Sequence, residues 1–201
     1  MKLFDITLPD NNICSYNSLY YRASQKVQRL ENTLIISKNQ KASFDTYFNC
    51  FSASKYLKHT NVKQIGISLT LKGNFEINLY FVEVSKSSQK KLLSSTSFNS
   101  INYDEVVIFQ DITMLTQQGY IYIELISKED ESVFYKGNYF TKNTKYHDTK
   151  IALIFCTYRR EDYLYRNVAN IKEYLLQNPE LSDKFCIIVI DNGNTINADM
   201  L

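Results

Sequence analysis

The 201-residue sequence contains no tryptophan, and it has only two prolines and five glycines. Collagen-like chains and flexible linkers are excluded, because both classes are rich in glycine and proline. Basic and acidic residues nearly balance, with 23 Lys and Arg against 21 Asp and Glu and a formal net charge of +2. Nucleic-acid-binding proteins use a basic excess against the phosphate backbone, so we expect no nucleic-acid partner.

Long apolar runs are also missing. The longest span residues 151–156 and 185–190, and both are far shorter than the ~20 residues of a membrane-spanning helix. The first residues, MKLFDITLPDNN, lack the apolar stretch of a secretory signal. These features favour a cytoplasmic protein.

Metal-binding patterns are absent as well. The cysteines are Cys14, Cys50, Cys156 and Cys186. They form no Cys-x-x-Cys pair, and His59 and His147 stand near no such pair, so the sequence predicts no zinc site. We expect free thiols in a reducing cytoplasm, and a disulfide framework stays open as the alternative.

Tyrosine and phenylalanine are abundant, with 16 and 12 copies, and such residues favour β-structure. Apolar and polar residues alternate over 64–71 and again over 75–81, separated by Lys72-Gly73-Asn74. This pattern predicts a β-hairpin. Residues 120–127 and 132–140 also alternate, which predicts a second hairpin with a charged tip.

Three shorter segments, 34–37, 42–48 and 106–109, are further strand candidates. Residues 85–100 are rich in serine and lysine, which predicts a long mobile loop. Short alternating strands joined by polar turns are typical of antiparallel sandwiches and barrels. We therefore expect a mainly β protein in which residues 1–148 form a jelly-roll-like antiparallel β-sandwich.

The alternating pattern of apolar and polar residues ends near residue 149. Residues 151–156 and 185–190 are continuously apolar, as in strands buried on both faces. Between them, apolar residues recur at helical spacing over 161–177, which predicts a crossover helix. Residues 149–201 are thus expected to form a β-α-β unit with parallel strands. Since two strands and one helix leave a sheet face and an edge uncovered, we expect the truncated start of a longer α/β domain.

Polar residues follow both strands at the positions where open α/β sheets bind ligands. The candidates for nucleotide binding are Thr157, Arg159, Arg160, Asp191, Asn192 and Gly193. The arginines precede a helix N-terminus that favours phosphate, and the Asp-Asn pair can hydrogen-bond a base or ribose. The glycine-rich fingerprints of dinucleotide and P-loop sites are absent. On spacing alone, solvated arginines and a simple turn stay equally open.

These segments resemble a known family. KIALIFCTYRRE at 150–161, the helix, and IIVIDNG at 187–193 resemble the opening of a family 2 glycosyltransferase with the GT-A, Rossmann-like fold. More narrowly, they are similar to the bacterial galactofuranosyltransferases, which have an N-terminal β-sandwich before the catalytic domain. SFDTYFN at 43–49, followed by Phe51, resembles the sandwich signature of that group.

The resemblance implies transfer of galactofuranose from a UDP-sugar donor to a growing cell-surface glycan acceptor. It implies that Thr157 and Arg160 contact the nucleotide, and that Asp191-Asn192-Gly193 contacts uracil or ribose. No Asp-x-Asp motif occurs, so the ligands of the Mn²⁺ or Mg²⁺ expected for the full-length parent are missing, as is the carboxylate base. We therefore assign this chain no catalytic residue, metal ligand or cofactor, and expect it to be inactive alone.

Two other functions stay open: a non-catalytic carbohydrate-binding or oligomerisation module, and a different nucleotide-binding α/β enzyme with a β accessory domain. The tyrosines considered for sugar stacking are Tyr47, Tyr56, Tyr80, Tyr103, Tyr120 and Tyr122. Ordinary sheet packing is the favoured interpretation of these residues. Lys86, Lys90 and Lys91 form a small basic patch. A weak peripheral contact with the inner membrane face stays open for this patch, and a solvated loop is the favoured interpretation. The uncovered strands also make a homo-oligomer a candidate assembly.

Overall fold

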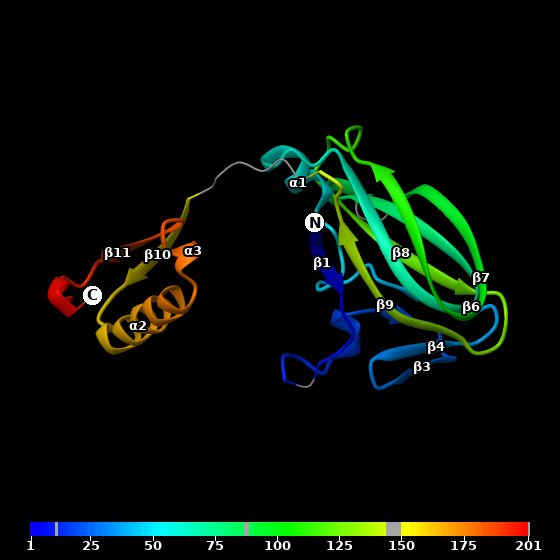
Figure 1. The fold of residues 1–201 in the computed structure, drawn as a ribbon, viewed down its shortest axis with the longest axis horizontal. Helices are drawn as coiled ribbons and strands as arrows, with labels where there is room; N and C mark the ends of the chain where they lie inside the picture. The colour runs from blue at the N-terminus through cyan, green and yellow to red at the C-terminus, as the bar shows by residue number, and fades with distance from the viewer. Residues whose placement is uncertain (11, 87–88, 144–149, 201) are drawn as a thin grey trace. The chain divides into compact units, whose positions relative to one another are not determined.

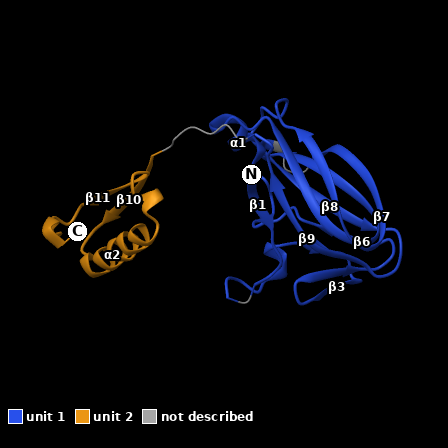
Figure 2. Ribbon diagram, in the orientation of Figure 1, with its two compact units in different colours: residues 1–145 blue, residues 146–201 orange. Residues whose placement is uncertain are grey.

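The computed structural model describes residues 1–10, 12–86, 89–143 and 150–200. Its contacts divide the chain into two compact units, unit 1 (residues 1–145) and unit 2 (residues 146–201), which Figure 2 colours separately. Unit 1 is built mainly from antiparallel strands, and unit 2 is a small α/β unit (Figure 1).

The elements of unit 1 follow the alternating apolar segments of the sequence. The strands are β1 (Lys2–Ile6), β2 (Arg22–Ala23), β3 (Val27–Leu30), β4 (Thr33–Ile36), β5 (Lys41–Ser43), β6 (Gln64–Glu83), β7 (Lys90–Asp111), β8 (Gly119–Ser127) and β9 (Ser132–Phe140). The helical segments are η1 (Asn17–Leu19), α1 (Ala53–His59) and η2 (Val84–Lys86). Antiparallel strands of this kind bury one face and leave the other to solvent, which explains the alternation.

The long strand β6 organises unit 1, because its two halves pair with different partners. Residues 66–72 of β6 pair with β9, whereas residues 75–83 pair with β8. β7 runs along the opposite edge of β6 over most of its length. β4 and β3 extend the β9 side, and β5 and β2 extend the β8 side, so two layers share the β6–β7 pair (Figure 1).

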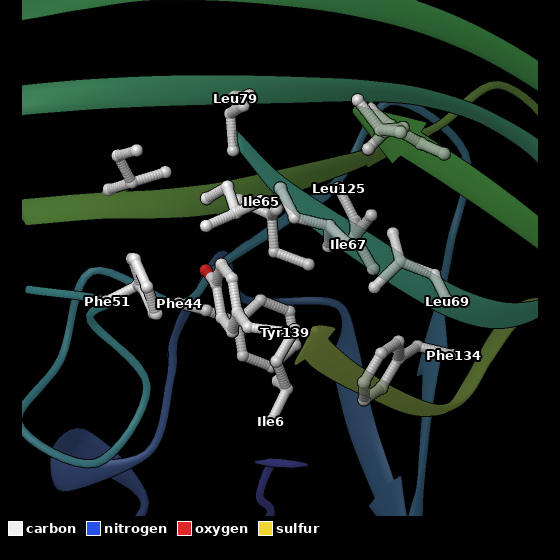
Figure 3. Packing of buried hydrophobic residues seen from close by; sticks show 14 of the residues in the cluster. Ile6, Phe44, Phe51, Ile65, Ile67, Leu69, Leu79, Leu125, Phe134 and Tyr139 are labelled. Carbon is white, nitrogen blue, oxygen red and sulfur yellow. The ribbon is translucent and has the colours of Figure 1, made fainter. Parts of the chain in front are cut away.

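The hydrophobic core lies between these two layers. Ile67 and Leu79 of β6, Leu125 of β8 and Phe134 of β9 are all fully buried. Rings from the two sides meet, since the centroids of Phe44 and Phe134 are 5.1 Å apart. Figure 3 shows these residues packed together. The predicted antiparallel β-sandwich is therefore confirmed as the architecture of unit 1.

The hairpin predicted over residues 64–81 is wrong, because β6 continues through Lys72-Gly73-Asn74. Gly73 has a φ of 108°, a conformation that glycine adopts without steric cost. A Cβ at this position would lie 2.8 Å from the Cα of Ser132. The pairing register between β6 and β7 shifts between Leu71 and Gly73 of β6. The glycine therefore marks the point where the strand passes from one layer to the other, and the chain does not reverse there.

The second predicted hairpin is wrong in its pairing, although both of its strands exist. β8 pairs with β5 and β6, whereas β9 pairs with β1, β4 and β6. The charged residues 128–131 therefore connect the two layers. Across this connection, Ser127 Oγ donates a hydrogen bond to Ser132 Oγ at 2.8 Å.

Two further strand predictions need correction. Residues 90–100, expected in a mobile loop, belong to β7. Serines do not prevent this, because strand pairing uses backbone groups and an edge strand keeps one face in solvent. The strand predicted at 42–48 is shorter, since β5 ends at Ser43. Beyond it, the side chains of Thr46 and Asn49 bond to another segment of the backbone.

Unit 2 consists of β10 (Ile151–Thr157), α2 (Glu161–Gln177), α3 (Pro179–Ser182), β11 (Phe185–Asp191) and η3 (Ala198–Met200). β10 and β11 pair in parallel, and α2 has the predicted bounds. Two strands and one helix are expected to leave a sheet face uncovered, and this expectation is confirmed among the described residues, because Ile154 and Ile188 are 59% and 44% exposed. Among the helices that the structure describes, none is both long and apolar enough to cross a membrane.

Candidate functional site

The last residues of β10 and β11, Thr157 and Asp191, lie opposite each other in the parallel register. The backbone N–H of Asn192 donates a hydrogen bond to the Thr157 carbonyl oxygen at 2.9 Å. Parallel strands end at the same sheet edge, so the two loops that follow begin side by side. We call residues 157–160 and 191–193 the strand-end site.

The carboxylate of Asp191 organises the loop after β11. Its Oδ1 accepts a hydrogen bond from Gly193 N at 2.8 Å, and its Oδ2 accepts from Thr195 N and Ile196 N at 2.7 and 2.8 Å. These backbone hydrogen bonds, that of Ile196 foremost, hold the pKa of Asp191 below its ordinary value. The side chain is therefore ionised at neutral pH and is engaged with its own loop.

Gly193 and Arg159 lie where the two loops approach each other. A Cβ on Gly193 would lie 3.1 Å from the backbone nitrogen of Arg159. The backbone of Arg159 has a φ of 51°, a left-handed conformation that residues other than glycine rarely adopt. Its guanidinium carbon lies 5.2 Å from the centroid of the Tyr158 ring. Such strained positions are found repeatedly at ligand-binding loops.

Thr157 and Arg160 line a hollow of about 440 Å³ beside the start of α2. Arg160 immediately precedes α2 as its N-cap residue, and its side chain makes no capping hydrogen bond. A helix N-terminus favours an anion through its dipole. Tyr163 and Asn167 line the same hollow from α2. The sequence motifs did not single out these two residues. Their spacing was the available signal for this site: Tyr163 and Asn167 are four residues apart, so they lie on the same face of the helix that follows Arg160.

The predicted residues thus divide into two groups. Thr157 and Arg160 share the hollow, whereas Gly193 lies against the backbone of Arg159.

Acidic side chains are close to the two arginines. A hydrogen bond with the Thr195 side chain, with a smaller contribution from the charge of Arg159, lowers the pKa of Glu161. The two arginines therefore do not form an isolated positive patch.

Metal ligands are not brought together at this site. Across the part of the chain that the structure describes, no group of three His, Cys, Asp or Glu side chains could hold a metal ion. Asp191, the carboxylate at the strand end, is already engaged by backbone N–H groups. These residues do not fit Mn²⁺ or Mg²⁺, and we assign them no metal role.

The cysteines and histidines are scattered. All four cysteines are free. Burial, assisted by the charge of Asp45, raises the pKa of the Cys50 thiol to about 12. His59 is the last residue of α1, and His147 lies outside the described residues. Within the described part of the chain, the thiols therefore form neither a disulfide with one another nor part of a metal site.

The signature segment at 43–49 has a structural role in unit 1. Thr46 Oγ1 and Asn49 Nδ2 both donate hydrogen bonds to the Tyr20 carbonyl oxygen at 2.6 Å. Asn49 Nδ2 also donates to the Thr7 carbonyl oxygen, and Asn49 Oδ1 accepts from Thr7 N, each at 2.8 Å. Tyr47 between them is 82% exposed. We call Thr7, Tyr20, Thr46 and Asn49 the Asn49 cluster, and it ties three segments together.

The tyrosines considered for sugar stacking do not form one platform. Tyr80 and Tyr122 stack with centroids 5.4 Å apart, and Tyr120 lies 6.4 Å from Tyr122. The face of Tyr80 is covered by the Lys90 ammonium at 4.0 Å, and Tyr122 is 3% exposed. Lys90 also lies 3.6 Å from the carboxylate of Glu124. The other three tyrosines pack against different rings. The rings of Tyr80 and Tyr122 are therefore engaged within the fold, whereas Tyr47 and Tyr103 stay 82% and 54% exposed at separate places.

Three solved structures illustrate the likeness of the fold to known proteins. The CBM22-1–GH10 modules of xylanase 10B from Clostridium thermocellum are 9% identical, with 88% of this chain and 37% of that chain covered and a TM-score of 0.45. The xylan-binding CBM22-1 domain of Paenibacillus barcinonensis Xyn10C is 9% identical (68% and 90% covered, TM-score 0.39). A family 29 carbohydrate binding module is 11% identical (69% and 87% covered, TM-score 0.38). Scores this low carry no argument about function.

The family comparison is stronger. No curated protein matches the sequence, and the chain spans 37% and 16% of the first two solved structures that resemble it. The model described as galactofuranosyltransferase 2 N-terminal, however, matches residues 6–142. Since these residues form most of the chain and lie within unit 1, the chain belongs to the galactofuranosyltransferase 2 N-terminal family.

Proposed function

We propose that this chain is the N-terminal part of a glycosyltransferase that transfers galactofuranose from a UDP-sugar to a growing cell-surface glycan. In this proposal, the strand-end site of unit 2 binds the UDP moiety. The family match supports a galactofuranosyltransferase. The observation that carries the nucleotide assignment is the shared hollow of Thr157 and Arg160, at the carboxyl end of β10 and the start of α2.

Each residue has a defined role in this proposal. Arg160 pairs with the diphosphate, because a guanidinium offers parallel donors to phosphate oxygens and the helix N-terminus adds to the attraction. The Thr157 hydroxyl bonds the same group. Asp191 holds the following loop in place through its backbone hydrogen bonds. The exposed amide of Asn192 then bonds uracil or ribose.

The chemical step needs further groups. A divalent cation, Mn²⁺ or Mg²⁺, neutralises a leaving diphosphate, and a carboxylate deprotonates an acceptor hydroxyl. Among the described residues, no group of three His, Cys, Asp or Glu side chains could hold the cation, so the proposed contribution of the chain is donor binding alone. The same proposal locates the enzyme in the cytoplasm, at the inner face of the membrane.

Titration calorimetry with UDP tests this site. Arg160→Ala should weaken UDP binding by about tenfold to a hundredfold, because hydrogen bonds to charged groups contribute about 1.5–3 kcal/mol. Lys184→Ala is the matched control, since it removes one positive charge just before β11, at the opposite end of the strands. Uridine, which lacks the diphosphate, should bind all three proteins equally. Equal UDP affinity for the wild type and Arg160→Ala, or no UDP binding at all, would contradict the proposal.

A further inference from the structure

A groove of about 610 Å³ opens in unit 1 where one edge of β9 is unpaired. β1 pairs with β9 between Gly137 and Phe140, and β4 pairs with it between Ser132 and Phe134. Neither strand pairs with Tyr135 or Lys136, and both of these residues line the groove. We call this cavity the β9 groove. Its volume lies within the range of roughly 300–1,000 Å³ that is usual for small-molecule sites.

The walls of the β9 groove are held by the Asn49 cluster. Thr7 and Tyr20 line the groove, and the Asn49 side chain bonds the backbone of both. Phe48 also lines it, and its ring stacks on Tyr20 with centroids 4.5 Å apart. These contacts exist before any ligand arrives. A ligand would therefore lose little free energy in ordering the walls.

The β9 groove combines an exposed ring with polar side chains. Tyr135 is 46% exposed although its ring is tilted against Tyr103, with centroids 5.7 Å apart, and has the Lys136 ammonium 5.7 Å from its centroid. Asn12 and Asn32 contribute amides, and Arg29 and Lys136 contribute cations. Within the described ranges, neither Arg29 nor Lys136 takes part in an ion pair. Arg29 Nε donates a hydrogen bond to the Glu31 carbonyl oxygen at 2.9 Å. No carboxylate among the described residues takes up the other donors of Arg29 or those of Lys136.

This combination fits a saccharide better than other classes of ligand. A sugar ring has a C–H face that packs on an aromatic ring, and hydroxyls that bond amides and cations. The unpaired edge covers only Tyr135 and Lys136, which is too short for strand addition by a peptide. Asp10 also lines the groove, and its carboxylate can accept hydrogen bonds from sugar hydroxyls.

We propose that the β9 groove binds a short oligosaccharide. One sugar ring packs on Tyr135, and its hydroxyls bond the amides of Asn12 and Asn32 and the guanidinium of Arg29. The groove lies in unit 1, whereas the proposed UDP site lies in unit 2. Each binding property can therefore fail without the other.

Titration calorimetry of the full chain with two probes tests this proposal. The probes are a galactofuranose tetrasaccharide, which is neutral, and a galacturonate trisaccharide, which is acidic. Tyr135→Ala should weaken the binding of a probe by about fivefold or more, because it removes the stacking ring. Tyr174→Ala removes another exposed tyrosine, from unit 2, and should change nothing. Circular dichroism confirms that each variant is folded.

Two more variants complete the test. Asn32→Ala changes an exposed turn residue and should weaken binding even if Tyr135→Ala fails to fold. Arg29→Gln keeps a donor but removes the charge, so it should weaken the acidic probe more than the neutral one. Binding of either probe with these responses supports the proposal. Failure of both probes to bind, or affinities unchanged in Tyr135→Ala and Asn32→Ala, would overturn it.

Discussion

Replacing Asn49 with alanine should be one of the most destabilising single changes in unit 1. The Asn49 side chain is fully buried and makes hydrogen bonds to Thr7 N, Thr7 O and Tyr20 O at 2.8, 2.8 and 2.6 Å. Alanine removes all of them and leaves the backbone groups to find other partners. At a net ~1 kcal/mol per bond, the free energy of unfolding should fall by about 3 kcal/mol.

Urea denaturation of the full chain measures this loss. The sequence contains no tryptophan, so far-UV circular dichroism follows the transition, and hydrogen exchange with mass spectrometry assigns it to unit 1. The midpoint should fall while the dependence on urea stays unchanged, because the native fold is retained. For a domain of this size, the melting temperature should drop by roughly 10 °C.

Two comparisons make the result specific. Tyr47→Ala changes a residue of the same segment that is 82% exposed, and stability should stay within about 0.5 kcal/mol of the wild type. Asn49→Asp keeps an acceptor for Thr7 N but sets a carboxylate oxygen against two carbonyl oxygens. It should therefore destabilise unit 1 more than alanine does at neutral pH. An Asn49→Ala protein as stable as the wild type would refute the bonding role of the Asn49 cluster.

Two further outcomes can be measured on the same chain. Tyr139→Phe should leave the free energy of unfolding unchanged or raise it by about 1 kcal/mol, because the buried Tyr139 hydroxyl has no partner among the described residues. A clear loss in urea denaturation would speak against this. The lowered pKa of Asp191 means that its loop contacts are fully present above the ordinary value of 3.8 and are lost as the pH falls through the lower folded value. The amide resonances of Gly193 and Ile196 should titrate accordingly, and a midpoint above 3.8 would contradict the assignment.

The fold of unit 2 can be predicted from local signals. A helical period over 161–177 and two continuous apolar runs each specify one element. A crossover of this length makes the two strands parallel, as the structure shows. The neighbouring positions of Thr157 and Asp191 follow from this topology alone. The exposed apolar face of the strands was expected as well, because two strands and one helix cannot cover both faces of a sheet.

Unit 1 can be predicted in class but not in pairing. Alternation shows that a segment is a strand, yet it does not name the partner strand. A glycine such as Gly73 between two alternating runs suits either a turn or a bend, and the outcome depends on contacts with β8 and β9, which are remote in sequence. The 106–109 part of β7 was predicted as a strand, whereas residues 90–100 escaped detection because their backbone pairing with β6 requires no apolar side chains.

The details of both candidate sites depend on contacts that have no sequence pattern. The hydrogen bonds of Asp191 require the loop through Ile196 to fold back on its carboxylate. The β9 groove brings together residues as distant in sequence as Asn12, Asn32 and Tyr135. No local motif surrounds Asn12, Asn32 or Tyr135, so only the three-dimensional arrangement makes these three residues candidates.

The signature segment and the proposed transfer chemistry belong to different parts of the chain. Asn49 is fully buried and bonds backbone atoms of unit 1, so a family match over residues 6–142 reports a shared scaffold. UDP binding is proposed for Arg160 and Thr157, which lie outside the matched residues. It follows that Asn49→Ala should lower the stability of unit 1 and leave UDP affinity unchanged. Arg160→Ala should weaken UDP binding and leave the stability of unit 1 unchanged. Measuring both properties on both variants separates the architecture of this family from the nucleotide binding proposed for this chain.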